Sequence, residues 1–280
     1  MLRMSDIGFN WGSARRAASA QRWERQSAAM GSGVTQAIVD AAEPAPGMQV
    51  LDLACGTGAP ALQIARRVSP GGRVIGIDLA AAALEIAQHR AHERNLDNVE
   101  FQQHDAQNLP FADATFDLVT SRFGLMFFSD LPRALADSRR VLRPGGRFAA
   151  ITWGTFEQQT YFRSTFGVVL RELPGAELPP AAGPIFKFGT PGTLSSVLQA
   201  AGFRDIREQV MEVPWVWPGA PAEIWQYVQE STVPFRPLID LITLNDRQRI
   251  ESRVVQELSQ YERDGEVRMT AVVVIVTAAK

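Results

Sequence analysis

The organisation of this chain follows from one stretch, Val50-Leu51-Asp52-Leu53-Ala54-Cys55-Gly56-Thr57-Gly58-Ala59-Pro60-Ala61. It begins as an apolar run typical of a buried parallel strand, breaks at a Gly-x-Gly turn and continues as a helix. The two glycines allow a sharp bend and let a ligand approach the main chain closely. Asp52 comes near the carboxyl end of the strand, where open α/β sheets bind ligands. A carboxylate here would repel a pyrophosphate, so the stretch favours a ligand that carries an ammonium group.

The same stretch also satisfies a second pattern. Gly56 to Ala61 fit the Gly-x-Gly-x-x-Gly/Ala fingerprint of dinucleotide-binding proteins, and Asp78 follows at about the expected distance. A nicotinamide-dependent oxidoreductase is therefore one alternative. A glycine turn made only for tight packing is another. The downstream motifs have to separate these interpretations.

Composition sets further bounds. The 280 residues are 46% hydrophobic and 21% charged, which suits one large globular domain or a core with a smaller cap. A net charge of -2 argues against nucleic acid as a partner. The single cysteine, Cys55, excludes an internal disulfide and fits a cytoplasmic location. No signal-peptide pattern and no membrane-length apolar run occur, so we expect no membrane span. Whether the protein forms a homodimer stays open.

Strands and helices are predicted to alternate in the first part of the chain. The pattern predicts strands over 48–54, 73–78, 99–103, 116–121 and 147–153, with helices over 59–69, 80–95 and 130–142 between them. This alternation indicates an α/β fold with a parallel sheet and right-handed crossovers. Helices over 13–30 and 34–43 are expected upstream. A helix over 190–202 and strands over 205–213 and 270–277 are expected downstream.

Two aromatic-rich stretches, 154–189 and 214–266, have no clear period, and the second is expected to be partly helical. Both fall between late elements of the predicted sheet. They could form a cap that excludes water from a ligand pocket. The alternatives are a cover for the sheet edge or a dimer contact.

With these motifs in place, the chain resembles the class I S-adenosylmethionine-dependent methyltransferases. The pattern is most similar to the small-molecule branch that includes the ubiquinone/menaquinone-biosynthesis methyltransferases. The resemblance covers roughly residues 50–153. Besides the opening stretch, the matching segments are Gly76-Ile77-Asp78, Asp105-Ala106 with Leu109-Pro110-Phe111, Phe116-Asp117-Leu118-Val119, Phe123-Gly124-Leu125 and Val141-Leu142-Arg143-Pro144-Gly145-Gly146-Arg147-Phe148.

The resemblance implies a Rossmann-like sheet of seven mostly parallel strands, with an antiparallel last strand and helices on both faces. It divides the chain into an N-terminal helical cover and an S-adenosylmethionine-binding core interrupted by two lid insertions. The implied segments are the cover at 1–46, the core at 47–153, 190–213 and 269–280, and the insertions at 154–189 and 214–268.

The resemblance also implies a cofactor, S-adenosylmethionine, and a set of residues that bind it. Asp52 would favour the ammonium group, Asp78 would accept hydrogen bonds from both ribose hydroxyls, and Asp105 would accept one from the adenine amino group. At each Asp, capping of the next helix is the structural alternative. The full implied set is Asp52, Ala54, Gly56, Thr57, Gly58, Asp78, Leu79, Asp105, Ala106, Ser121 and Arg122, with Leu79 against the adenine and Ser121 and Arg122 near the methionyl end.

The implied reaction is methyl transfer to a small, largely apolar acceptor such as a phenol, a quinol or a secondary metabolite, on oxygen or carbon. Proximity and exclusion of water would supply most of the rate, so a protein base is not obligatory. His104 and Tyr161 are the candidates if a base is used, and no metal is expected. The acidic residues other than Asp78 have no evident role in an oxidoreductase, which disfavours that alternative. Binding of the cofactor without methyl transfer stays open.

The chain departs from the quinone-biosynthesis pattern at two places. Met126-Phe127-Phe128 stands where that branch is more polar, and the second insertion is longer than that branch needs. Both departures make a secondary metabolite as plausible an acceptor as a quinol.

Overall fold

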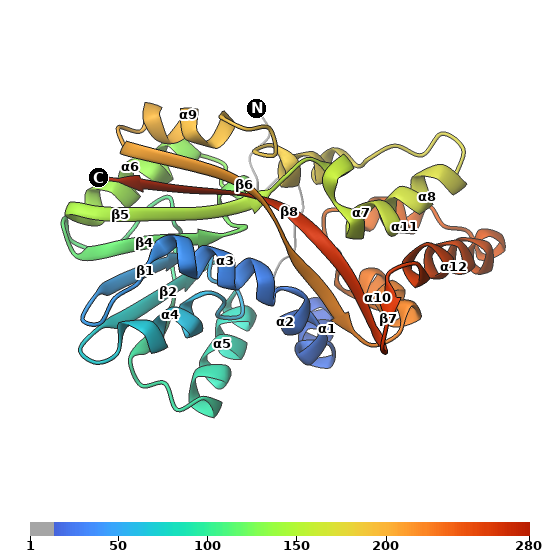
Figure 1. Cartoon of the computed structure of the whole chain (residues 1–280), viewed down its shortest axis with the longest axis horizontal. Helices are drawn as coiled ribbons and strands as arrows, with labels where there is room; N and C mark the ends of the chain where they lie inside the picture. Colours follow the sequence, from blue (N-terminus) through green and yellow to red (C-terminus); the bar gives the residue numbers. More distant parts are fainter. Residues whose placement is uncertain (1–13) are drawn as a thin grey trace. The chain divides into compact units, whose positions relative to one another are not determined.

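The computed structural model describes residues 14–280, so the first thirteen residues of the predicted cover lie outside the described part (Figure 1). The strands are β1 (Gln49–Leu53), β2 (Arg73–Asp78), β3 (Val99–Gln103), β4 (Phe116–Arg122), β5 (Leu142–Trp153), β6 (Arg204–Pro218), β7 (Glu262–Arg263) and β8 (Glu266–Ala279).

The α-helices of the described chain are α1 (Ala14–Arg22), α2 (Glu24–Met30), α3 (Ser32–Ala42), α4 (Ala61–Val68), α5 (Ala81–Glu93), α6 (Leu131–Val141), α7 (Thr160–Ser164), α8 (Phe166–Glu172), α9 (Thr193–Ala200), α10 (Pro221–Ser231), α11 (Arg236–Asp240) and α12 (Leu244–Ser259). Short 3-10 helices are η2 (Leu125–Phe127), η3 (Phe156–Gln158) and η4 (Pro180–Phe186).

The strands form one sheet in the order β3-β2-β1-β4-β5-β8-β6, and the two-residue β7 pairs with β8. The pairs among β1 to β5 are parallel, and β8 runs antiparallel to β5. The predicted sheet of mostly parallel strands with an antiparallel last strand is therefore confirmed. The strand order reverses direction between β1 and β4. In open α/β sheets, ligands bind at this switch point.

The chain divides into two compact units. Unit 1 comprises the described residues up to Val34 together with Gly154–Lys187 and Glu212–Val272, and unit 2 comprises Thr35–Trp153, Phe188–Met211 and Val273–Lys280. Strands β6 and β8 contribute residues to both units.

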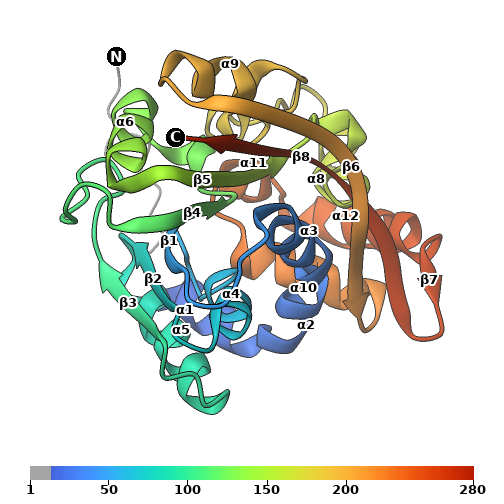
Figure 2. The same ribbon diagram turned by 60° about the vertical axis from the view of Figure 1, so that its left-hand side comes forward.

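The core of unit 2 lies where α3, α4 and α5 pack on the parallel strands. Val39 and Ala42 of α3, Ile64 of α4 and Ala91 of α5 join strand residues such as Val50 in one buried cluster. Right-handed crossovers place the helices before and after the switch point on opposite faces of the sheet. Figure 2 accordingly shows α4 on one side of the parallel strands and α6 on the other.

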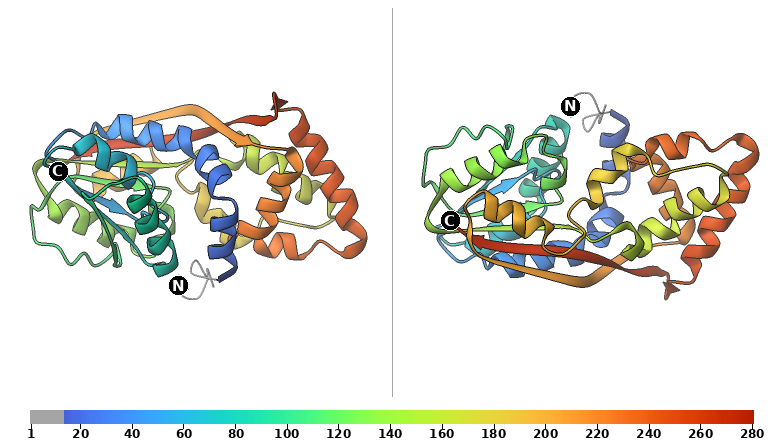
Figure 3. Two further views of the ribbon diagram at one scale, coloured as in Figure 1. Left: turned by 90° about the horizontal axis from the view of Figure 1, so that it is seen from below. Right: turned by 90° about the horizontal axis from the view of Figure 1, so that it is seen from above.

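Unit 1 is mainly helical and is held by aromatic side chains. The rings of Phe166 and Phe235 stack with centroids 3.8 Å apart, and Phe162 lies against both. Helices α10 and α12 contact each other and lie side by side, drawn orange and red in Figure 3. The expectation that 214–266 is partly helical is confirmed, since this stretch contains α10, α11 and α12, whereas α7 and α8 in 154–189 were not predicted.

Two strand boundaries also differ from the prediction. Strand β6 continues to Pro218, whereas the sequence predicted its end at 213. Strand β8 begins at Glu266, whereas the predicted start was 270. The segment 143–146, between the predicted helix and the predicted strand, lies inside β5 at an irregularity of the pairing. Phe116 pairs with Leu142, but Leu118 pairs with Arg147. Gly145 adopts a φ of 77° there, which only glycine takes up without strain.

Packing of β5 yields a prediction for the stability of unit 2. Phe148 is fully buried, and its ring lies 5.2 Å from that of Phe203. We expect Phe148→Ala to lower the free energy of unfolding by about 3–5 kcal/mol, because the ring leaves a cavity. Val210→Ala on β6, where the side chain is 41% exposed, should cost less than about 1 kcal/mol. Denaturation in urea measures both, and equal losses would contradict this packing.

Candidate cofactor site

Asp52 is a carboxylate buried in the middle of the sheet. Its side chain is fully buried, and the register places it between Gly76 of β2 and Thr120 of β4. The Thr120 hydroxyl donates a hydrogen bond to Asp52 Oδ1 at 2.7 Å. Asp52 Oδ2 has no hydrogen-bond partner among residues 14–280. A buried carboxylate oxygen without a donor is costly, so this position fits a ligand that brings a cationic N–H group.

Burial also changes the protonation of Asp52. Loss of solvent raises its pKa to about 7, and the Thr120 hydrogen bond, the positive charge of Arg122 and the backbone amide of Ala61 oppose this rise. The carboxyl group is therefore partly protonated near neutral pH. A cation placed beside Oδ2 would favour the ionised form.

The glycine turn after β1 has an unusual backbone. Ala54, Gly56 and Gly58 all have positive φ values, of 52°, 53° and 99°. A Cβ on Gly58 would lie 2.8 Å from Leu62 Cδ1, so this glycine is required for packing. A Cβ on Gly56 would meet nothing within 4 Å. The backbone at Gly56 therefore borders open space, as a turn that receives a ligand must.

Asp78 ends β2 and is fixed to the glycine turn. Its Oδ2 accepts from the Gly56 amide at 2.9 Å, and its Oδ1 accepts from the Ala80 amide at 2.9 Å. Each oxygen retains acceptor capacity, because a carboxylate oxygen has two lone pairs. The next residue, Leu79, is 62% exposed. A carboxylate with an exposed apolar side chain beside it suits a ribose attached to a flat base.

Asp105 lies in the loop after β3 and is held by Gln107. Asp105 Oδ1 accepts from the Gln107 backbone amide at 2.8 Å and from its side-chain Nε2 at 3.1 Å. Ala106 is buried. His104 is half-buried, with its ring centroid 6.2 Å from that of Phe111. His104 therefore lies against an aromatic ring in this loop.

Side chains from β4 and α5 hold the turn in place. The Ser121 hydroxyl donates to the Leu53 carbonyl at 3.2 Å, and Arg122 Nε donates to the Ala59 carbonyl at 3.3 Å. From the other side, the buried Arg90 donates to the Thr57 carbonyl at 2.9 Å. The turn is therefore braced by three side chains.

Direct bonds and strand register bring nine of the predicted residues together at the carboxyl ends of β1, β2 and β4, namely Asp52, Ala54, Gly56, Thr57, Gly58, Asp78, Leu79, Ser121 and Arg122. Asp105 and Ala106 follow β3, whose last residue Gln103 pairs with Asp78. Sequence reasoning did not identify Thr120, Gln107 or Gly124. A Cβ on Gly124 would lie 2.7 Å from Ala54 Cβ, so this residue packs directly on the turn.

Tyr161 belongs to unit 1, whereas His104 belongs to unit 2. The ring of Tyr161 contacts those of Phe162 and Trp215. Burial, together with Tyr227, raises the pKa of its phenol well above the ordinary value of 10.0. The Tyr161 hydroxyl therefore stays protonated at neutral pH. A role for either residue as a base stays a prediction.

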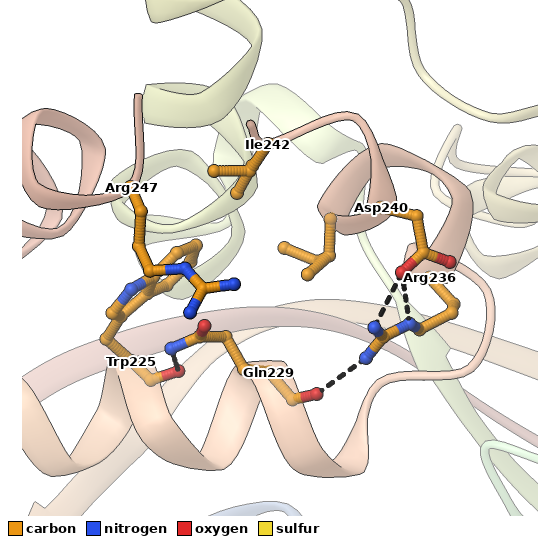
Figure 4. Close-up of a pocket in the computed structure, with 7 residues that line it drawn as sticks. Trp225, Gln229, Arg236, Asp240, Ile242 and Arg247 are labelled. Carbon is orange, nitrogen blue, oxygen red and sulfur yellow. Dashed lines mark hydrogen bonds and ion pairs between the residues drawn. The ribbon is translucent and has the colours of Figure 1, made fainter. Parts of the chain in front are cut away.

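Unit 1 contains a cavity of about 340 Å³ between α10, α11 and α12 (Figure 4). Arg236 donates to Asp240 Oδ1 at 2.8 Å and to the Gln229 carbonyl at 2.9 Å, so the charge of this arginine is balanced. Trp225 and Arg247 also line it, with Ile239 and Ile242 as the aliphatic part. The volume lies in the range of small-molecule sites.

Among the described residues, no helix combines the length and the apolar character needed to cross a membrane. Within the same residues, no three His, Cys, Asp or Glu side chains are grouped so that they could hold a metal ion.

Comparison with known proteins identifies relatives of this chain. The methyltransferase-domain family matches residues 50–146. Nocamycin O-methyltransferase of Saccharothrix syringae is 30% identical over 254 residues, which cover 87% of this chain and 89% of the relative. The demethylmenaquinone methyltransferase of Thermus thermophilus is 36% identical over 65% of this chain and 81% of the relative. A solved S-adenosylmethionine-dependent methyltransferase from Aquifex aeolicus has the same fold, with a TM-score of 0.53 at 20% identity over 70% of this chain and 92% of its own.

The buried Asp52 predicts a pH dependence of stability. Because its pKa is raised from 3.8 to about 7 on folding, the folded protein binds a proton more tightly than the unfolded chain between these values. This proton stabilises the folded state at low pH, and the contribution is lost as the pH rises toward 7. We expect the free energy of unfolding of the wild type, taken relative to that of Asp52→Asn, to decrease from roughly pH 5 to pH 8.

Urea denaturation at both pH values measures this shift. Asp97→Asn is the matched control, since Asp97 is exposed and in the same unit. A wild type and Asp52→Asn with parallel pH profiles would contradict the buried, proton-binding carboxyl group.

Proposed function

Because this chain belongs to the S-adenosylmethionine-dependent methyltransferases, we propose that it methylates an oxygen of a small, largely apolar secondary metabolite. The observation that carries this proposal is the extent of the match to the nocamycin O-methyltransferase, which spans 87% of the chain. A match of that length has to include much of both aromatic-rich stretches. The demethylmenaquinone methyltransferase of Thermus thermophilus matches only 65%. C-methylation of a quinol is the second candidate.

Two features of the chain support an acceptor of this kind. Met126, in the segment where the quinone branch is more polar, is 2% exposed and forms part of η2. The second insertion, 214–268, is also longer than the quinone branch needs. The segments 154–189 and 214–268 would then serve as the acceptor lid.

The residues around the glycine turn fit the cofactor that the family uses. Asp52 Oδ2 would receive the ammonium group, because it is buried and lacks a donor in the described chain. Asp78 would accept from the ribose hydroxyls with its remaining lone pairs, and Leu79 would cover the adenine with its exposed side chain. Asp105 would accept from the adenine amino group. The open space at Gly56 would admit the methionyl part.

These residues would act by binding and alignment. S-adenosylmethionine supplies a methyl group that its sulfonium already activates, for in-line displacement by the acceptor oxygen. Asp52 and Asp78 would hold two ends of the cofactor, which fixes the reacting centre and supplies effective molarity. Apolar side chains of the lid would exclude water. If a base assists, His104 or Tyr161 would take the acceptor proton, and Tyr161 would first have to lose its own.

A substitution at Gly56 tests the assignment of the open space. Gly56→Ala should weaken binding of S-adenosylmethionine by about tenfold or more, since the Cβ would occupy the space proposed for the ligand. Its cost in stability should be about 1–2 kcal/mol, from the positive φ alone. Gly47→Ala is the matched control, because Gly47 has a φ of 86° and also has nothing within 4 Å. Equal binding by both variants in calorimetric titration would contradict the assignment.

Transfer of labelled methyl groups tests the acceptor class. The enzyme is incubated with methyl-labelled S-adenosylmethionine and a panel of phenols, hydroxylated polyketides, demethylmenaquinol and amines. We expect label in methyl ethers of the hydroxylated acceptors, identified by mass spectrometry. Label only on a carbon of demethylmenaquinol would favour the second candidate. Label only in the amines would overturn both.

A further inference from the structure

Gln107 connects the loop after β3 to the beginning of α6. Its Oε1 accepts from the Asp130 amide at 2.6 Å and from the Ser129 hydroxyl at 2.9 Å. Its Nε2 donates to Asp105 Oδ1 at 3.1 Å and to Oδ2 at 3.3 Å. The two ends of one amide group are therefore both occupied, one by the helix and the other by the carboxylate.

The rest of this loop is fixed to the same helix. The Leu109 amide donates to Asp137 Oδ2 at 2.6 Å. Arg140 donates to the carbonyls of Leu109 and Phe111 at 3.1 and 2.7 Å, and it pairs with Asp137 and Asp113. Since Asp137 and Arg140 hold the loop backbone, Gln107 is not needed to keep the loop on α6. Its contact with Asp105 calls for a separate explanation.

The hydrogen bonds of Asp105 are distributed unequally between its oxygens. Oδ1 accepts two, from the Gln107 amide at 2.8 Å and from Nε2 at 3.1 Å, whereas Oδ2 receives only the longer contact of 3.3 Å. The backbone bond alone would leave the carboxylate free to rotate about its terminal torsion, which has a broad energy minimum. The side-chain amide restricts that rotation and leaves Oδ2 with acceptor capacity.

We propose that Gln107 is a positioning residue that aims Asp105 Oδ2 at the exocyclic amino group of the cofactor's adenine. The inference rests on the proposed role of Asp105. Fixing the carboxylate before the ligand binds removes the entropic cost of ordering it on binding. Gln107 itself touches no ligand atom in this arrangement. Its effect is specific to the amino group of the base, because the ribose and methionyl contacts come from other residues.

The test compares two ligands that differ only at this group. S-adenosylhomocysteine carries the amino group, and its unsubstituted-purine analogue carries a hydrogen atom on the same ring carbon, with the neighbouring N1 unchanged. Calorimetric titration gives the dissociation constant of each for the wild type, Asp105→Ala, Gln107→Ala and Gln107→Met. The last variant keeps the approximate side-chain volume and loses the four side-chain hydrogen bonds, while the backbone bond to Asp105 remains. Gln63→Ala is the control, because Gln63 makes an exposed glutamine–glutamine hydrogen bond with Gln36 in the same unit.

We expect the wild type to prefer the adenine compound by about tenfold or more, which corresponds to about 1.4 kcal/mol. Asp105→Ala should reduce this preference to nearly one. Both Gln107 variants should lose most of the preference, through weaker binding of the adenine compound and nearly unchanged binding of the unsubstituted-purine compound. Gln63→Ala should bind both ligands as the wild type does.

Two outcomes would overturn the proposal, and they are distinguishable. If Asp105→Ala keeps the wild-type preference, Asp105 does not bind the amino group and the proposed cofactor contact fails with it. If Asp105→Ala loses the preference but the Gln107 variants keep it, the contact with Asp105 stands and positioning by Gln107 fails. Equal weakening of both ligands in the Gln107 variants has the same meaning, since a merely structural role would affect both alike.

Discussion

The hydrogen bond from the Gly56 amide to Asp78 joins the turn after β1 to the end of β2. It forms because the parallel register pairs Leu53 with Ile77, so both strands end at the same level. The turn could not reach Asp78 without positive φ values, and Ala54, Gly56 and Gly58 supply them. The remaining supports, from Ser121, Arg122 and Arg90, hold the turn in that position. The geometry of the candidate site thus depends on this contact between two adjacent strands.

The burial of Asp52 in the sheet is unfavourable for the free energy of folding. A carboxylate in the centre of a sheet loses its solvation, and Thr120 compensates only one of its oxygens. The cost is reduced by proton uptake, which the raised pKa reflects. A ligand with an ammonium group would supply the missing partner and favour ionisation. Carboxyl groups buried without a counter-charge are common in binding sites. They lower the stability of the free protein and favour the binding of a cationic group.

The sequence predicted the sheet well because parallel strands buried on both faces have nearly continuous apolar runs. The position of Asp52 and the glycine turn after the first strand followed from these runs, whereas the cofactor roles of the acidic residues came from the resemblance and stay predictions. In unit 1 the sequence predicted a helix over 13–30 but not the bounds of the helices in the two aromatic-rich stretches, because rings such as Phe166 and Phe235 from distant segments pack them. Gln107 and Thr120 gave no signal, since a polar residue in a loop or strand shows its role only once its partner is known. The extension of β6 and β8 also escaped prediction, because it depends on pairing between segments far apart in the chain.

The most direct test of this account is a crystal structure of the enzyme with S-adenosylhomocysteine. We predict that both ribose hydroxyls lie within hydrogen-bonding distance of Asp78, that the amino group of the homocysteine part faces Asp52 Oδ2, and that the adenine lies on Leu79. A ligand bound elsewhere, or one that leaves the Asp78 carboxylate and the space at Gly56 without contact, would contradict the account.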